Sequence, residues 1–458
     1  MNLPDEMRDL WTDAAKRAID YREGLDTRSV APEPGALEEL VRHLGGDLPG
    51  GPAPAQQVLD LLDRYGSPAT TASAGGRYFG FVIGGSLPAT VAASWLATAW
   101  DQNTGLLVAA PATTLLEKIA LDWLLEILDL PRGSAGAFVT GGQLANFTAL
   151  AAARHAVLAK QGWDVEARGL FGAPEISVVV GAEAHSTIFK ALAMLGLGRD
   201  RVVRIPIDAQ GRMRVDALPS LDGPAIVCIQ HGNVNSGAFD PAEPIVEWAH
   251  RNGSWVHVDG AFGLWARATP ERAHLGEGAQ LADSWATDAH KWLNVPYDCG
   301  IALVRDPAAL RGAMGTAAAY LQESPVREPM QYTPELSRRA RGVEVWAALK
   351  SLGRSGVADL VERCCSHATR FAAGLRSSGF EVLNEVVLNQ VLVSFGNDDV
   401  THRVIEGVQK EGTCWCGGTV WRGRAAMRIS VSSWVTTAED VDASLAAIRR
   451  VAREAHNP

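Results

Sequence analysis

The chain has 458 residues, of which 47% are hydrophobic and 21% are charged, and its formal net charge is −10. This length supports two or three domains, and the acidic balance argues against nucleic acid or an anionic membrane as a partner. Six cysteines suggest no disulfide framework, and Cys414-Trp415-Cys416 lacks the spacing of a zinc site. The sequence shows neither a signal peptide nor a membrane-spanning run. We therefore expect a cytoplasmic protein without a metal site.

The first part of the chain has helical hydrophobic spacing that Pro and Gly residues interrupt. Helices are expected over residues 5–25, 36–44 and 56–65. An arm this apolar would not be stable alone. We therefore expect residues 1–80 to form a helical arm that packs on a second copy of the chain.

From about residue 100 the pattern alternates between helix and strand. A helix is expected over 112–128, and short apolar strands over 137–140, 176–181, 202–205, 225–230, 256–259, 284–287 and 300–304. This order predicts a mostly parallel sheet with helices on both faces, an α/β domain over 81–345. A linking helix over 338–352 leads into a small α+β domain, residues 346–458, with helices over 358–375, 403–411 and 438–454 and strands over 381–383, 390–395 and 426–431.

Lys291 and Asp259 are the strongest candidate site residues. Lys291 follows a predicted strand within Thr287-Asp288-Ala289-His290-Lys291-Trp292, and Asp259 ends the strand Val256-His257-Val258-Asp259. A buried lysine can act as an amine nucleophile toward an aldehyde, and a buried carboxylate can hold a protonated pyridine nitrogen. These are the two protein groups that pyridoxal phosphate (PLP) requires. A structural ion pair between the two residues is the alternative.

Three loops after predicted strands carry further candidates. In Val139-Thr140-Gly141-Gly142-Gln143-Leu144 two glycines turn the chain into a helix, whose free N–H groups suit a phosphate. His185 follows the strand 176–181, where an imidazole could stack on a flat ring. Asn235 and Ser236 follow the strand 225–230 and could hydrogen-bond a cofactor. A plain helix start, an ordinary histidine and an ordinary loop remain open as alternatives.

Taken together, the segments 287–293 with 297–299, 256–261 and 109–117 resemble the lysine motif, the aspartate-bearing strand and the phosphate-site helix of one family. This family is the group II PLP-dependent amino-acid decarboxylases, which include aromatic-amino-acid, histidine and glutamate decarboxylases. The likeness runs from about Tyr78 to the C-terminus. It implies the aspartate-aminotransferase-like PLP fold (fold type I), built as a homodimer with both active sites at the interface.

The resemblance also implies a role for each matching residue. Lys291 would bind PLP covalently, Asp259 would pair with the ring nitrogen, and His185 would stack on the ring. The remaining residues would complete the cofactor site (Gly142, Gln143, Asn235, Ser236, Ala261 and His290) and the substrate pocket (Tyr78, Phe79 and Asn103).

Two features depart from the family pattern. Family decarboxylases carry a mobile loop with a tyrosine that helps protonate Cα, whereas the stretch 321–336 is short and its nearest aromatic residue, Tyr332, is displaced. Asn103-Thr104-Gly105 stands where aromatic decarboxylases place apolar pocket residues. The sequence predicts that Tyr332 lies in a mobile surface lid and donates the proton to Cα. A tyrosine that only packs, with His185 as the donor, is the alternative.

The resemblance implies PLP-dependent decarboxylation of an L-amino acid, with an aromatic one favoured. Arg422 and Arg428 are candidates for holding a substrate carboxylate, with structural salt bridges as the alternative. Three other functions stay open: an aldehyde-forming variant that releases ammonia and peroxide, a carbon–carbon lyase, and a PLP-binding protein kept for regulation. A lyase would need further basic residues near the pocket, and a regulatory protein would not need Lys291, Asp259 and His185 together.

Overall fold

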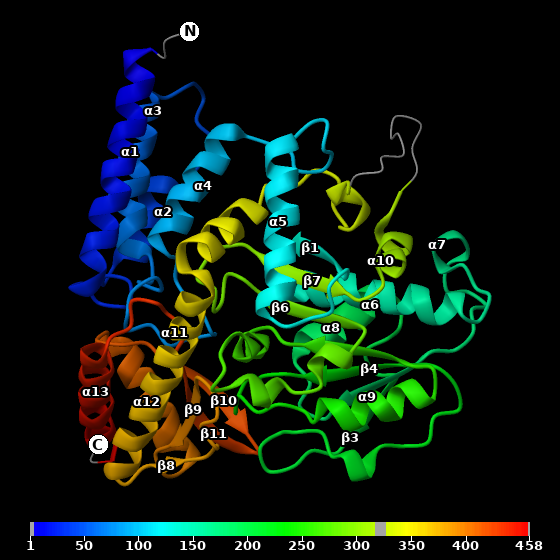
Figure 1. Ribbon diagram of the computed structural model, residues 1–458. Coiled ribbons are helices and arrows are strands. Elements are labelled where there is room, and N and C mark those ends of the chain that lie inside the picture. The colour runs from blue at the N-terminus through cyan, green and yellow to red at the C-terminus, as the bar shows by residue number, and fades with distance from the viewer. Residues whose placement is uncertain (1–3, 317–326, 457–458) are drawn as a thin grey trace.

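The computed structural model describes residues 4–316 and 327–456, and its centre is a seven-stranded sheet (Figure 1). The strands are β1 (Ala135–Val139), β2 (Ser177–Gly181), β3 (Val202–Ile205), β4 (Ala225–Gln230), β5 (Trp255–Asp259), β6 (Ser284–Asp288) and β7 (Gly300–Val304). Their order is β1-β7-β6-β5-β4-β2-β3. β7 runs antiparallel to both neighbours, and the remaining pairs are parallel. The carboxyl ends of β2, β4, β5 and β6 therefore meet at one edge.

Helices cover both faces of this sheet because alternate strand residues point to opposite sides. In β1, Ala137 and Val139 belong to one hydrophobic core and Phe138 to the other. The helices of the large domain are α5 (Pro111–Ile127), α6 (Gly142–Ala159), α7 (Val165–Arg168), α8 (Ser186–Met194), α9 (Ala242–Arg251) and α10 (Pro307–Met314). Helices α6, α8 and α10 supply the core on one face, and α5 and α9 supply the core on the other.

The smaller C-terminal part has a four-stranded antiparallel sheet of order β10-β11-β9-β8. Its strands are β8 (Glu381–Val382), β9 (Gln390–Ser394), β10 (Gly417–Trp421) and β11 (Arg424–Ser430), and its helices are α12 (Asp398–Glu411) and α13 (Ala438–His456). Helix α11 (Gly342–Ser377) joins it to the large domain and is interrupted at Gly353, whose φ of 61° is not helical. Single turns of 3₁₀ or π helix cover Gly24–Asp26, Leu62–Gly66, Ser67–Ala69, Val215–Ala217, Gly263–Ala268, Ala273–Gly276, Ala279–Leu281 and Pro329–Gln331.

The N-terminal arm stands beside α5 and α11 at the left of Figure 1. Several of its apolar side chains are exposed. Its helices are α1 (Asp5–Glu23), α2 (Ala36–Leu44), α3 (Ala55–Leu61) and α4 (Pro88–Trp100). Helix α1 buries none of its residues. Trp11, Val41, Leu62 and Trp95 are all exposed. In the described residues, no helix combines the length and the hydropathy needed to cross a membrane.

The strand prediction for the large domain is confirmed, since all seven strands form within two residues of the expected limits. The sequence reading missed α4, whose apolar residues show no helical stripe, and β10, which contains two glycines. The linking helix also begins later than predicted, at Gly342. The preceding Arg338 is held by a buried ion pair with Glu117.

Candidate active site

Three predicted site residues meet at the carboxyl edge of the central sheet. Asp259 ends β5, His185 follows β2, and Lys291 follows β6. A cavity at this edge is lined by His185 and Asp259 together with Gly181 and Gln230 at the ends of β2 and β4. Lys291 lies close enough to influence the charge of both His185 and Asp259. In open α/β sheets this edge is where ligands bind.

Asp259 is a buried carboxylate that requires a positive partner. Its oxygens accept hydrogen bonds from Asn146 Nδ2 and from the backbone N–H of Ala261, both at 3.3 Å. Burial raises the pKa of Asp259, and the nearby His185 and Lys291 oppose that effect. A protonated ring nitrogen placed in the cavity would be the positively charged partner of this carboxylate.

His185 is held by a chain of hydrogen bonds that leads to the sheet. Its Nδ1 lies 2.8 Å from Thr187 Oγ1, which also accepts a hydrogen bond from Asn146 Nδ2 at 3.2 Å. Asn146 Oδ1 in turn accepts from His257 Nε2 at 2.9 Å. Burial lowers the pKa of His185, which favours the neutral form of the ring, the form suited to stacking on a flat cofactor. The sequence reading missed Asn146 and Thr187 because no local pattern marks an amide that bridges three elements.

Lys291 forms an ion pair with Asp288, which the sequence reading did not single out. Lys291 Nζ lies 2.9 Å from Asp288 Oδ2, and the two side chains are 21% and 1% exposed. The alternative of an ion pair between Lys291 and Asp259 is not seen, because Lys291 pairs with Asp288. His290 stacks on Tyr297 at 4.3 Å between ring centroids, and its Nδ1 accepts the backbone N–H of Cys299 at 3.1 Å.

The predicted phosphate end of the site is the start of α6. The helix begins at Gly142, and a Cβ on this residue would stand 2.6 Å from Asp288 Oδ2, so only glycine leaves the space open. Gln143 Nε2 is buried and has no hydrogen-bond partner in the described part of the chain. Free helix N–H groups and a buried amide donor without a partner fit a phosphate group. Together with Asp259 and Lys291, these residues fit PLP.

Asn235 and Ser236 lie in the loop after β4, where their side chains bond to protein groups. The Ser236 hydroxyl donates to the carbonyl of Gln210 at 2.6 Å and accepts the N–H of Ala238 at 3.2 Å. Asn235 Oδ1 accepts from the Thr419 hydroxyl on β10 at 2.9 Å. The bond from Thr419 ties the loop to the small domain. The Ser236 hydroxyl, predicted to hydrogen-bond a cofactor, donates to Gln210 in this structure.

An aromatic group lies where the segment after the N-terminal arm pairs with the small domain through Tyr78 and Trp415. Tyr78 stacks on Trp415 with ring centroids 5.1 Å apart, and the exposed ring of Phe81 lies 5.4 Å from that of Trp415. Phe79 points the other way, into the core against Phe371 at 5.0 Å. Phe79 therefore faces the core, because neighbouring residues of an extended segment face opposite sides. Its place in the substrate pocket stays a prediction.

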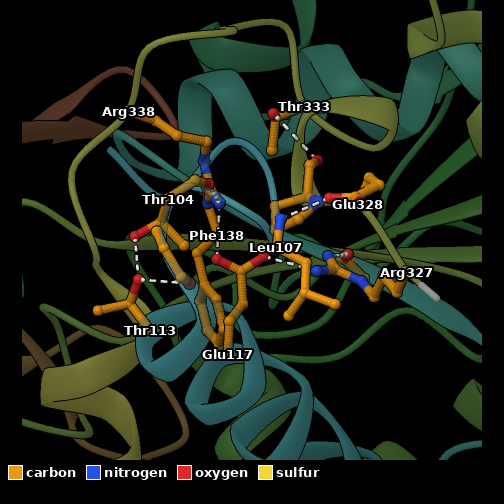
Figure 2. Close-up of polar contacts among 12 residues, drawn as sticks. Thr104, Leu107, Thr113, Glu117, Phe138, Arg327, Glu328, Thr333 and Arg338 are labelled. Carbon is orange, nitrogen blue, oxygen red and sulfur yellow. Dashed lines mark hydrogen bonds and ion pairs between the residues drawn. The ribbon is translucent and has the colours of Figure 1, made fainter. Parts of the chain in front are cut away.

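Asn103 lies in a different recess from Lys291. Its Oδ1 accepts the backbone N–H of Arg338 at 2.9 Å, and the recess is lined by the end of α4 and residues 337–340. Behind it Glu117 accepts hydrogen bonds from Arg338 at 2.6 Å and Arg327 at 2.8 Å (Figure 2). Arg338 also donates to the carbonyls of Thr104 and Phe138. This buried network fixes the Asn103 segment to β1.

Tyr332 is part of the core and not of an exposed lid. Its side chain is 9% exposed, and the Arg327 guanidinium carbon lies 4.7 Å from its ring centroid. The prediction of a mobile surface lid is therefore wrong at Tyr332, although residues 321–326 of that stretch lie outside the described residues. The proline-rich composition that suggested a lid belongs to a segment that Arg327 and Glu328 anchor to α5 and to Leu107.

Arg428, on β11, is half-buried and makes a single hydrogen bond through its guanidinium to the described residues. It donates to the carbonyl of Val234 at 3.2 Å and forms no ion pair with any residue in 4–316 or 327–456. It also acts on the charge of His185, and burial lowers the pKa of Arg428. The structural salt bridge considered for Arg428 is absent from the described residues, so its free donors point to an anionic ligand.

Comparisons with known proteins identify the family of the chain. Residues 40–396 match the family described as "Pyridoxal-dependent decarboxylase conserved domain". Tryptophan decarboxylase 1 of Oryza sativa is 27% identical over 99% of this chain and 95% of its own length, and the L-2,4-diaminobutyrate decarboxylase of Rhizobium meliloti is 29% identical over 78% and 72%. The crystal structure of Oryza sativa TDC with PLP and tryptamine superposes with a TM-score of 0.90 at 26% identity and covers 99% of each chain, which confirms fold type I. The chain belongs to the pyridoxal-dependent decarboxylase family.

Proposed function

We propose that this PLP-dependent carboxy-lyase acts on an aromatic L-amino acid and releases the corresponding amine and carbon dioxide. The observation that carries the choice of substrate is the stacked pair Tyr78 and Trp415, with Phe81 beside it. Aromatic rings favour such neighbours, and each pair contributes roughly 0.5–1.5 kcal/mol beyond buried area. The similarity to a tryptophan decarboxylase over 99% of this chain supports the same choice.

PLP, when bound, supplies an electron sink that accepts the electron pair released as carbon dioxide leaves Cα. In the proposal Lys291 holds the cofactor covalently, and the phosphate rests on the N–H groups of Gly142 and Gln143. Asp259 keeps the ring nitrogen protonated, which its own need for a positive partner supports. The neutral His185 ring stacks on the cofactor and, with the phosphate end, fixes the ring plane.

We further propose that Arg428 binds the substrate carboxylate. Its side chain is half-buried, acts on the charge of His185 and has no carboxylate partner among the described residues. A charge-assisted, bidentate contact would orient the carboxylate relative to the ring plane. The bond to be broken must stand perpendicular to that plane for its electrons to reach the ring.

The proposal includes a homodimer in which each chain completes the site of the other. The apolar side chains left exposed on α1, α2 and α4 need a covering surface. Asn103 lies in a recess that contains none of Lys291, Asp259 and His185, so it would serve a site formed with the second copy. The six cysteines are free thiols, which is typical of a reducing compartment and supports a cytoplasmic location.

The second candidate function is the aldehyde-forming reaction, which the packing of Tyr332 supports. A tyrosine held in the core under Arg327 is poorly placed to act as a mobile proton donor. A screen of L-amino acids should quantify carbon dioxide, amine, aldehyde, ammonia and peroxide together. Equal amounts of amine and carbon dioxide from tryptophan, tyrosine or phenylalanine would support the proposal. Equal amounts of aldehyde, ammonia and peroxide would favour the second candidate, and release of carbon dioxide from non-aromatic substrates alone would contradict the proposed substrate class.

A further inference from the structure

Asp288 is a buried carboxylate that has one charged partner. It is the last residue of β6, and its Oδ2 lies 2.9 Å from Lys291 Nζ. Neither of its oxygens accepts a well-aligned hydrogen bond from the residues that the structure describes. A carboxylate buried without such bonds is costly, and removal of its only counter-ion adds to that cost. The charge of Asp288 is therefore balanced by the Lys291 ammonium.

His290 cannot take the place of Lys291 as this counter-ion. Its Nδ1 accepts the N–H of Cys299, so the proton of the neutral ring sits on Nε2, which lies 3.6 Å from Asp288 Oδ1. Burial lowers the pKa of His290, which disfavours the charged form of the ring. The stacked Tyr297 brings no charge either, since burial raises the pKa of its hydroxyl.

The other charged groups around Lys291 come from different strands and have other partners. Asp259, on β5, already accepts two hydrogen bonds and in the proposed function faces the cofactor ring nitrogen. His185 is neutral because burial lowers its pKa, and Arg428 on β11 carries the same charge as the lysine ammonium. Asp288 is thus the carboxylate in ion-pair contact with Lys291 in the described residues.

This ion pair can exist only while Lys291 is free, and here the inference rests on the proposed function. When Lys291 is bonded to the aldehyde carbon of PLP, its nitrogen is no longer an ammonium. As the substrate amine replaces it, a bond forms between the substrate nitrogen and that carbon, and the bond from carbon to the Lys291 nitrogen breaks. The protons that the substrate ammonium gives up are taken by Lys291, so charge and atoms balance and the lysine leaves as an ammonium.

We propose that Asp288 stabilises this released ammonium and thereby shifts the exchange equilibrium toward the substrate amine. An interaction made in one of two states moves the equilibrium by its own free energy. The ion pair with Asp288 is such an interaction, because the lysine-bonded state has no free ammonium to pair with the buried carboxylate. Asp288 is then a positioning residue that acts through Lys291.

The test compares Asp288→Asn with Asp298→Asn as the matched control. Asp298 follows the same lysine motif, but its carboxylate pairs with Arg341 at 2.8 Å. An unreactive amine such as tryptamine is added to each holoenzyme, and the spectral change on exchange gives the concentration for half conversion. We expect Asp288→Asn to raise this concentration roughly tenfold to a hundredfold, the range of one charge-assisted contact. The control should change it by less than about twofold.

A second measurement needs no bound cofactor. In the full chain stripped of PLP, acetic anhydride acylates Lys291 only as the neutral amine, and peptide mass mapping gives the rate at each pH. Without the carboxylate beside it, the ammonium is less stable, so acylation in Asp288→Asn should begin at lower pH than in the control. Asp288→Ser carries the same expectation and replaces Asp288→Asn if the latter does not fold.

Two results separate this inference from the proposed function. A wild-type protein that does not hold PLP on Lys291 would contradict the proposed function itself. A wild-type protein that exchanges normally, with Asp288→Asn matching Asp298→Asn in both measurements, would overturn the role of Asp288 alone.

Discussion

Glu117 is predicted to be among the most stabilising charges in the chain, and its replacement by Gln tests the buried network of Figure 2. The Glu117 side chain is 0% exposed, and it pairs with Arg338, also 0% exposed, and with Arg327. Burial raises the pKa of Glu117, but the two guanidinium groups outweigh it and lower the pKa overall. Glu117→Gln keeps the shape and leaves both arginines without their counter-ion. Breaking a buried pair in this way costs about 3–5 kcal/mol of unfolding free energy.

The same helix supplies the control. Glu126 pairs with Arg354 at 2.7 Å, but their side chains are 55% and 60% exposed, so Glu126→Gln should cost about 0–1 kcal/mol. Urea unfolding followed by tryptophan fluorescence measures both variants. The difference in unfolding free energy between wild type and Glu117→Gln should shrink in acid. A carboxylate whose pKa is depressed in the folded state stabilises that state at neutral pH and loses this contribution as the pH falls. A cost for Glu117→Gln within about 1 kcal/mol of the control would refute the reasoning.

Three further predictions concern the site and the core. Asp259→Asn should abolish turnover while weakening PLP binding by only about 1.5–3 kcal/mol, and turnover within about tenfold of wild type would contradict this. Trp415→Ala should raise KM for an aromatic substrate roughly 2- to 10-fold with little change in kcat. An unchanged KM would contradict a contact between Trp415 and the substrate. Burial lowers the pKa of His231 from 6.5 to about 3, so the unfolded chain is protonated first and stability falls below about pH 6.5. His231→Leu should remove roughly 2 kcal/mol of the loss between pH 7 and pH 5, measured by urea unfolding at both values, and an unaltered loss would count against it.

The central sheet could be predicted from the sequence because each of its strands is a short apolar run bounded by turn residues. The positions of Asp259, His185 and Lys291 followed from it, since residues after parallel strands share one edge. Helix α4 could not be predicted in this way, because its mean composition is apolar on all sides and gives no stripe.

The features of the site that the sequence did not predict have a common physical origin. The direction of Phe79 depends on whether its neighbours form an extended segment, and the burial of Tyr332 depends on Arg327 reaching Glu117 on a distant helix. Asp288 was not predicted as a site residue. Its contact with Lys291, at 2.9 Å, depends on one turn of irregular backbone between the two residues. Sequence spacing carries no information on such contacts.

The measurement that tests the central claim most directly is borohydride reduction of the PLP-loaded protein followed by peptide mass mapping. Reduction makes the bond between lysine and cofactor permanent, so the label marks the residue that carries PLP. The account predicts one labelled residue per chain, Lys291, with loss of the yellow colour. A label on any other lysine, or a protein that binds PLP without a label at Lys291, would contradict it.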